Sequence, residues 1–132
     1  MTYFEPFDSP GPGRERGTNT ITDKGKAYEA YDNGRYDEAM ILFEDITKSA
    51  DDPIVYLCLG NAQLKVGQLE KAEKSFNHVL TKHEDLVTPA SWYLALTYLK
   101  QNRMERAKSA LWQISKSSTY GEKAQNLLKD LD

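Results

Sequence analysis

Three alanines, Ala39, Ala72 and Ala107, lie 33 and 35 residues apart, and the residues around them match in type. Five residues before each alanine stands a residue that tolerates a left-handed backbone, and twelve before stands a small residue. Large apolar residues stand three before, four after and seven after. We call each set of three matching positions a column and the stretch around each alanine a copy. In the order of the copies along the chain, the columns are Gly34, Gly67 and Asn102; Ala27, Gly60 and Ala95; Tyr36, Leu69 and Met104; Phe43, Phe76 and Leu111; and Ile46, Val79 and Ile114. Such a repeat requires the same structural unit three times.

The unit that this spacing predicts is a pair of antiparallel helices. Apolar residues recur with helical periodicity from Thr20 onward, and no segment alternates as a strand would. The small residues let the two helices approach closely, while larger residues fill the space between neighbouring pairs. An N-cap residue followed by proline, in Asp52-Pro53 and Thr88-Pro89, predicts two of the helix starts. We therefore expect helices over 20–33, 37–49, 53–66, 69–83, 88–101 and 104–116.

The last residues of the chain predict one more helix, over about 119–130. Its apolar side chains share one face, and they are Tyr120, Ala124, Leu127, Leu128 and Leu131. A stack of repeats ends on an exposed apolar surface, so we expect this helix to cover the last hairpin as a cap.

The columns resemble the tetratricopeptide repeat family. The matching positions are clearest in two copies, as Gly34, Tyr36, Ala39 and Phe43 and as Gly67, Leu69, Ala72 and Phe76. The chain departs from the family pattern at Asn102, Met104, Asp23 and Lys26. The resemblance implies an all-α fold, a right-handed α-solenoid of three tetratricopeptide-like hairpins plus a C-terminal capping helix. The repeats would cover about 20–52, 53–87 and 88–118 of a domain spanning 20–132, with the cap at about 119–131.

In this family the first helix of each repeat lines a concave groove that binds an extended peptide or a partner helix. Carried onto the matching positions, the resemblance implies a groove formed by Lys24, Tyr28, Tyr31, Leu57, Asn61, Leu64, Lys65, Trp92, Leu96, Leu99 and Lys100. Aromatic rings supply contact area at low rotamer cost, and an amide can bond a peptide backbone. The alternative is that some rings, Trp92 and Tyr93 above all, pack between repeats or under the N-terminal segment.

Residues 1–19 form a lead-in whose prolines and glycines exclude a helix or a central strand. Three aromatic side chains, Tyr3, Phe4 and Phe7, are unusual in a flexible linker, so we expect them to dock on another surface. The run from Tyr3 to Phe7 also resembles the start of some bacterial membrane-anchored repeat proteins. That resemblance implies an anchor upstream and a periplasmic domain, with a cytoplasmic protein as the alternative.

Charge and motifs exclude several functional classes. With 17 basic and 20 acidic side chains the net charge is −3, which argues against nucleic-acid binding, and no stretch is apolar enough to insert into a membrane. No phosphate-binding loop or nucleophile elbow is present.

Individual residues that could carry chemistry have a simpler interpretation. On one helix His78 and His83 would point about 140° apart, which argues against shared metal ligation. Cys58 lies in an apolar helix and is expected to be a packed side chain. Asp51-Asp52 and Glu84-Asp85 are expected to cap helices.

The sequence therefore predicts no catalytic residue, no cofactor and no metal. The expected function is that of a non-catalytic protein–protein interaction scaffold, whose partner is a protein or peptide. Two alternatives are an accessory or regulatory domain of a larger membrane-anchored protein and a self-associating structural unit. The second alternative keeps a homo-oligomer among the expected partners.

Overall fold

The computed structural model describes residues 4–11, 22–117 and 119–131. The expected all-α class is confirmed for these residues, which form helices and no strand. The helices are α1 (Asp23–Asp32), α2 (Tyr36–Thr47), α3 (Pro53–Val66), α4 (Leu69–Lys82), the short 3₁₀ helix η1 (Glu84–Leu86), α5 (Val87–Lys100), α6 (Met104–Ile114) and α7 (Gly121–Leu131). None of these helices is both long and apolar enough to cross a membrane.

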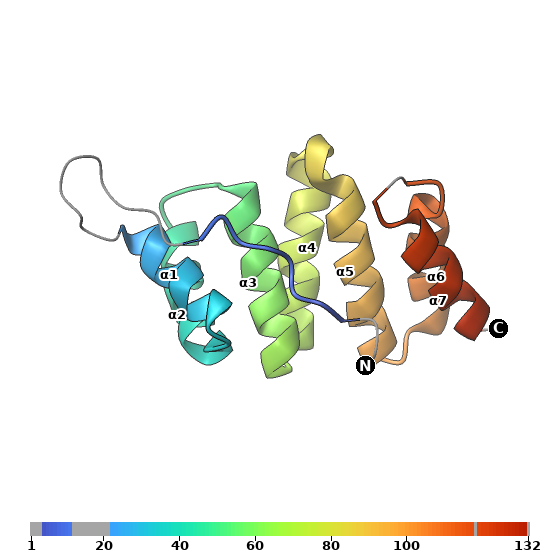
Figure 1. Ribbon diagram of the computed structural model, residues 1–132, viewed down its shortest axis with the longest axis horizontal. Coiled ribbons are helices and arrows are strands. Elements are labelled where there is room, and N and C mark those ends of the chain that lie inside the picture. The colour runs from blue at the N-terminus through green and yellow to red at the C-terminus, as the bar shows by residue number, and fades with distance from the viewer. Residues whose placement is uncertain (1–3, 12–21, 118, 132) are drawn as a thin grey trace.

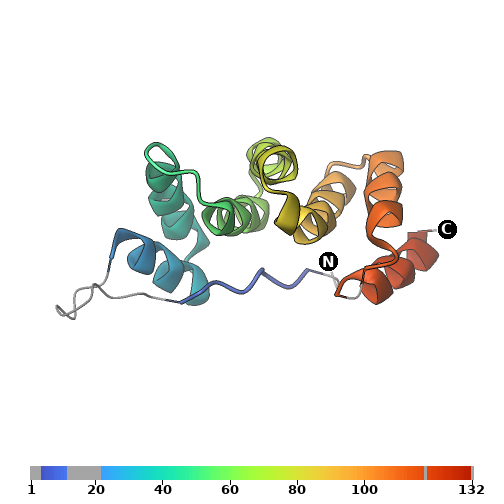
Figure 2. The same cartoon turned by 90° about the horizontal axis from the view of Figure 1, so that it is seen from above.

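The helices form two layers, and each α-helix packs on the next one in the chain. Figure 2 shows α1, α3, α5 and α7 in one layer and α2, α4 and α6 in the other. The extended residues 4–11 run along the outer side of the first layer, across α3 and α5 (Figures 1 and 2). This arrangement places a segment from the start of the chain beside helices from its middle and its end.

Three inter-helix turns share one geometry. Gly34, Gly67 and Asn102 have φ angles of 76°, 95° and 60°, which confirms the left-handed backbone expected at this column. The residue after each of them donates its N–H to a carbonyl five residues earlier at 2.8 Å, from Arg35 to Ala30, Gln68 to Gln63 and Arg103 to Tyr98. These bonds satisfy carbonyls that a helix end would otherwise leave unpaired.

The small residues of the repeat lie where helices meet. Ala27, Ala39, Ala72, Ala95 and Ala107 are completely buried. At Gly60 of α3, an added Cβ would lie 2.5 Å from Cε1 of the buried Phe76 ring of α4. A side chain at this position would therefore force the buried Phe76 ring to shift, which favours glycine.

Replacing Gly60 by alanine is expected to lower the free energy of unfolding. Overpacking a core costs about 1–3 kcal/mol, and the better helix propensity of alanine returns about 1 kcal/mol, so we expect a net loss of up to about 2 kcal/mol. Urea denaturation measures this loss. In a Phe76→Leu background the same substitution should cost clearly less, because the shorter side chain leaves room for the methyl group. Equal losses in both backgrounds would contradict the proposed clash.

Several predicted helix bounds need correction. The start at Asp52-Pro53 is confirmed, because the Asp52 carboxylate accepts bonds from the amides of Ile54 and Val55 at 3.0 and 3.4 Å. The predicted N-cap at Thr88 is wrong: η1 leads directly into α5, so Thr88 lies inside the helix. Proline is tolerated next to it because amides in a first turn need no helical partner.

At the N-terminal side, α1 begins at Asp23 and not at residue 20. Thr22 is extended and its hydroxyl caps the helix by accepting from the Gly25 amide at 2.9 Å. Residues 20 and 21, like 1–3 and 12–19 of the predicted lead-in, lie outside the described residues. The remaining ends differ from expectation by one or two residues, as in α2, α4, α6 and α7.

Candidate functional site

The extended segment 4–11 is held through its backbone by three side chains from three helices. The Phe7 amide donates to Oδ1 of Asn61 in α3 at 3.2 Å. The hydroxyl of Tyr31 in α1 donates to the Phe7 carbonyl at 2.5 Å, and the hydroxyl of Tyr93 in α5 donates to the Glu5 carbonyl at 2.7 Å. We call the surface of α1, α3 and α5 that carries Tyr31, Asn61 and Tyr93 the docking face. Backbone recognition of this kind requires an extended conformation and few particular side chains.

Two aromatic rings of the segment anchor it on Tyr93. Phe4 and Phe7 both meet the Tyr93 ring edge-on, with ring centroids 6.2 and 6.4 Å apart. Tyr93 is itself supported by the Phe76 ring, stacked at 5.9 Å. The ammonium of Lys65 lies 5.7 Å from the centroid of Phe4, within the range of a cation–π contact. The docking face therefore combines backbone hydrogen bonds with two apolar anchor points.

Polar contacts hold the segment near both of its ends. The Glu5 carboxylate lies 3.6 Å from the ammonium of Lys123 in α7. At the other end, the Ser9 hydroxyl donates to a carboxylate oxygen of Asp32 in α1 at 2.6 Å. The segment thus runs from α7 towards α1, opposite to the order of the helices in the chain.

The Asn61 side chain is held in position by its own helix. Its amide nitrogen donates to the Leu57 carbonyl at 2.8 Å, which turns the amide oxygen towards Phe7. Asn61 is completely buried, and both ends of its amide have a partner. A buried amide that lost its peptide partner would leave an acceptor unsatisfied, and this favours an occupied docking face.

Burial also determines the protonation of the two tyrosines. Desolvation is the main cause that raises the pKa of the Tyr31 and Tyr93 hydroxyls far above the usual value. Nearby ionisable side chains, Cys58 for Tyr31 and Tyr120 for Tyr93, raise it further. Both hydroxyls therefore stay protonated and act as donors to peptide carbonyls across the physiological pH range.

The predicted groove residues fall into groups. Tyr31 and Asn61 bond the segment, Lys65 lies over Phe4, and Leu64 and Lys100 line a small pocket with Phe4. Leu57, Trp92 and Leu96 belong to the buried core cluster against which Phe4, Phe7 and the half-buried Leu99 pack. Tyr28 is buried against Phe43, with ring centroids 5.5 Å apart. The ammonium of Lys24 forms an ion pair with Asp52 at 2.6 Å.

Sequence reasoning gave Tyr93 and Lys123 no place in the groove. In α5 every residue from Ala90 to Thr97 is buried, so its hydrophobic pattern does not separate a peptide-facing side from a core side. The sequence places Tyr93 only among rings expected to pack between repeats or under the N-terminal segment; in the structure it contacts Phe4 and Phe7 of that segment and Phe76 of α4. Lys123 belongs to α7, which was interpreted only as a cap.

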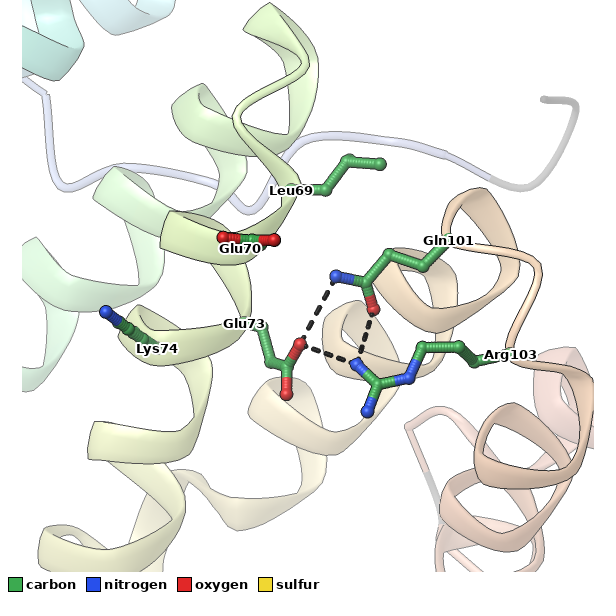
Figure 3. Close-up of a pocket in the computed structure, with 6 residues that line it drawn as sticks. All are labelled: Leu69, Glu70, Glu73, Lys74, Gln101 and Arg103. Carbon is green, nitrogen blue, oxygen red and sulfur yellow. Dashed lines mark hydrogen bonds and ion pairs between the residues drawn. The ribbon is translucent and has the colours of Figure 1, made fainter.

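A polar pocket between α4 and the α5–α6 turn lies apart from the docking face. Figure 3 shows Glu73, Gln101 and Arg103 converging there, with Leu69, Glu70 and Lys74 on the rim. The Arg103 guanidinium donates to Glu73 at 2.9 Å and to Gln101 at 3.1 Å, and the Gln101 amide donates to Glu73 at 3.2 Å. These hydrogen bonds pair the polar side chains with one another and link α4 to the turn between α5 and α6.

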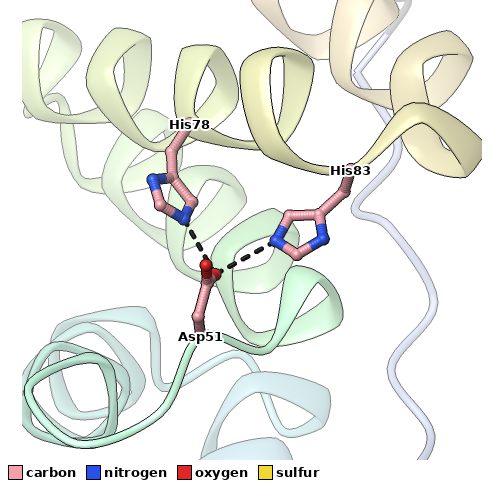
Figure 4. A group of neighbouring side chains, drawn as sticks. All are labelled: Asp51, His78 and His83. Carbon is pink, nitrogen blue, oxygen red and sulfur yellow. Dashed lines mark hydrogen bonds and ion pairs between the residues drawn. The ribbon is translucent and has the colours of Figure 1, made fainter.

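The structure also brings together two histidines that the sequence placed apart. α4 ends at Lys82, and His83 leaves the helical path with φ −137° and ψ 86°. The 140° separation expected on one helix therefore does not apply. Nε2 of His78 and Nε2 of His83 lie 2.8 and 3.0 Å from the same Asp51 oxygen (Figure 4). Hydrogen bonds from His78 and then His83 hold the pKa of Asp51 below its ordinary value.

Cys58, the one cysteine of the chain, is completely buried in α3. Burial raises the pKa of its thiol well above the usual value, so the reactive thiolate is disfavoured. Its surroundings are those of a packed core side chain, as the apolar helix around it predicted.

Neither a scan against protein-family models nor a search of curated proteins finds a match for this chain.

Proposed function

We propose that this chain is a non-catalytic protein-binding module of the tetratricopeptide-repeat type, an α-solenoid whose docking face binds extended segments. The observation that carries the proposal is the docked segment 4–11, in which Asn61, Tyr31 and Tyr93 bond the backbone of an extended chain. The repeat type is supported by the three turns with left-handed residues at a common column and by the buried small residues around them.

The contacts of segment 4–11 indicate the chemistry of a partner segment. Two aromatic residues three positions apart would occupy the places of Phe4 and Phe7, and a proline between them would favour the extended backbone that the hydrogen bonds require. An acidic residue beside the first ring would meet Lys123, as Glu5 does. The partner is therefore a protein with an exposed aromatic-acidic-proline-aromatic segment.

The chain's own segment competes with such a partner. A segment on the same chain acts at an effective concentration of about millimolar, so a partner of similar intrinsic affinity displaces it poorly. Binding is best measured in the variant Phe4→Ala with Phe7→Ala, which we call the opened variant. It retains the full chain and the whole docking face but lacks both anchor rings.

We expect a labelled peptide of residues 4–11 to bind the opened variant more tightly than the unmodified chain in fluorescence anisotropy. Adding Tyr31→Phe to the opened variant should weaken peptide binding by about fivefold, because one hydrogen bond of about 1 kcal/mol is lost while the ring remains.

The matched control is Tyr36→Phe in the opened variant. The Tyr36 ring packs edge-on against Tyr31, with centroids 5.8 Å apart, so both substitutions remove a hydroxyl from the same aromatic cluster. Peptide affinity should not change with Tyr36→Phe. The proposal is wrong if the opened variant does not bind the peptide, or if Tyr31→Phe and Tyr36→Phe have the same effect.

A further inference from the structure

Asp51, His78 and His83 bring three potential metal ligands to one point, away from the docking face. Asp51 comes from the connection between α2 and α3, His78 from the last turns of α4, and His83 from the residue after α4. Figure 4 shows both imidazole rings turned towards the Asp51 carboxylate. One ligand atom from each side chain lies within 4.8 Å of the other two.

These distances are close to those of a metal centre. Bonds of about 2.0–2.1 Å in a tetrahedral site separate the ligand atoms by roughly 3.3–3.4 Å. The two histidine nitrogens lie 2.8 and 3.0 Å from the Asp51 oxygen, and all three ligand atoms lie within 4.8 Å of one another. To hold an ion, the Asp51 oxygen must move a few tenths of an ångström away from each nitrogen, and the two rings must adjust to the separation of a tetrahedral site. An ion would take the place of the protons that now bridge the nitrogens and the oxygen.

The ligands are also held in position and open to solvent. The His78 ring stacks on Tyr56, with centroids 4.0 Å apart, and the His83 backbone amide donates to the Val79 carbonyl at 2.9 Å. The side chains of Asp51, His78 and His83 are 52%, 28% and 19% exposed, so an ion can enter and water can complete its coordination. The site lies at the C-terminal end of α4, where the helix dipole favours a cation.

We infer that Asp51, His78 and His83 form a binding site for one divalent transition-metal ion of the Zn²⁺ class. Two imidazoles and one carboxylate suit Zn²⁺, Co²⁺ or Ni²⁺ better than Mg²⁺ or Ca²⁺, which prefer oxygen ligands alone. The bound ion would join the α2–α3 connection to the end of α4, and its effect would therefore be to stabilise the α3–α4 pair.

The test uses the untagged full chain, with Zn²⁺ for stability and Co²⁺ for spectroscopy. At about 100 times its Kd, Zn²⁺ should raise the melting temperature by about 5 °C or more, because it binds the folded chain. Co²⁺ should give visible absorption bands typical of nitrogen and oxygen ligands. Absence of both the melting shift and the bands in the unmodified chain would overturn the inference.

Variants then assign the ligands. His83→Gln and Asp51→Asn each keep a side chain that can form hydrogen bonds, and each should weaken Zn²⁺ binding about tenfold or more. The matched control Glu84→Gln removes an exposed carboxylate next to His83 and should leave the affinity unchanged. Circular dichroism of the metal-free variants checks that they fold, and using two ligand variants keeps the test valid if one does not. Equal affinities in the ligand variants and the unmodified chain would place the ion elsewhere and refute the site.

Discussion

A chain that ends at Ser117 is expected to melt roughly 6 °C or more below the full chain and to associate at micromolar concentrations. The missing helix α7 buries Ala124, Leu127 and Leu128 against the main core cluster. Burying two leucines stabilises the fold by about 3–6 kcal/mol, and each kcal/mol corresponds to about 2–8 °C in a domain of this size range. Removing α7 also exposes the apolar side of the hairpin beneath it, which favours association.

Calorimetry and light scattering over a concentration series measure the two effects. A point variant tests the packing of α7 while the whole helix remains. Leu127→Ala should lower the free energy of unfolding by about 2–5 kcal/mol, whereas Asn126→Ala, at an exposed position of the same helix, should lower it little. An unchanged melting temperature and a monomeric truncated chain would show that α7 does not act as a cap.

The opened variant, Phe4→Ala with Phe7→Ala, is expected to release segment 4–11 from the docking face. Each half-buried ring contributes about 1–1.5 kcal/mol, so losing both should shift the docking equilibrium by about 30- to 150-fold. Hydrogen exchange reports the change directly, because the Phe7 amide is bonded to Asn61 and the alanine variant retains an amide at residue 7. The amide of residue 7 should therefore exchange about 30- to 150-fold faster in the opened variant than in the unmodified chain.

The control for this experiment is Asp8→Ala, at an exposed position of the same segment. It should leave the exchange of the Phe7 amide close to that of the unmodified chain. If the opened variant protects residue 7 as well as the unmodified chain does, the two rings do not anchor the segment.

Much of the helical framework follows from local chemistry that the sequence displays. The left-handed turns were predictable because Gly34, Gly67 and Asn102 recur at one column, and only such residues adopt positive φ at little cost. Asp52 with Pro53 similarly specified the start of α3. The aromatic residues of the lead-in predicted docking, since rings at that density are unusual in a linker.

The docking face and the cluster of Asp51, His78 and His83 depend on the three-dimensional arrangement of the helices, so the sequence could not predict them in the same way. The face that receives Phe4 and Phe7 is assembled from helices far apart in the sequence, and its central residue Tyr93 lies in a helix that is buried all round. The histidines meet because α4 ends one residue before His83, a difference within the usual uncertainty of a helix boundary.

The docked segment has a consequence for how the molecule unfolds. Each α-helix packs mainly on the next one in the chain, and in such an arrangement the end helices can unfold before the middle ones. Here the bond from Tyr93 to Glu5 joins residues 88 positions apart, and contacts to Lys123 and Asp32 reach both end helices. Unfolding of either end helix therefore breaks contacts to the extended segment 4–11, which also contacts α3 and α5. The segment links the stability of α1 to that of α7, so unfolding becomes more cooperative, and the distant contacts slow the search for the native state.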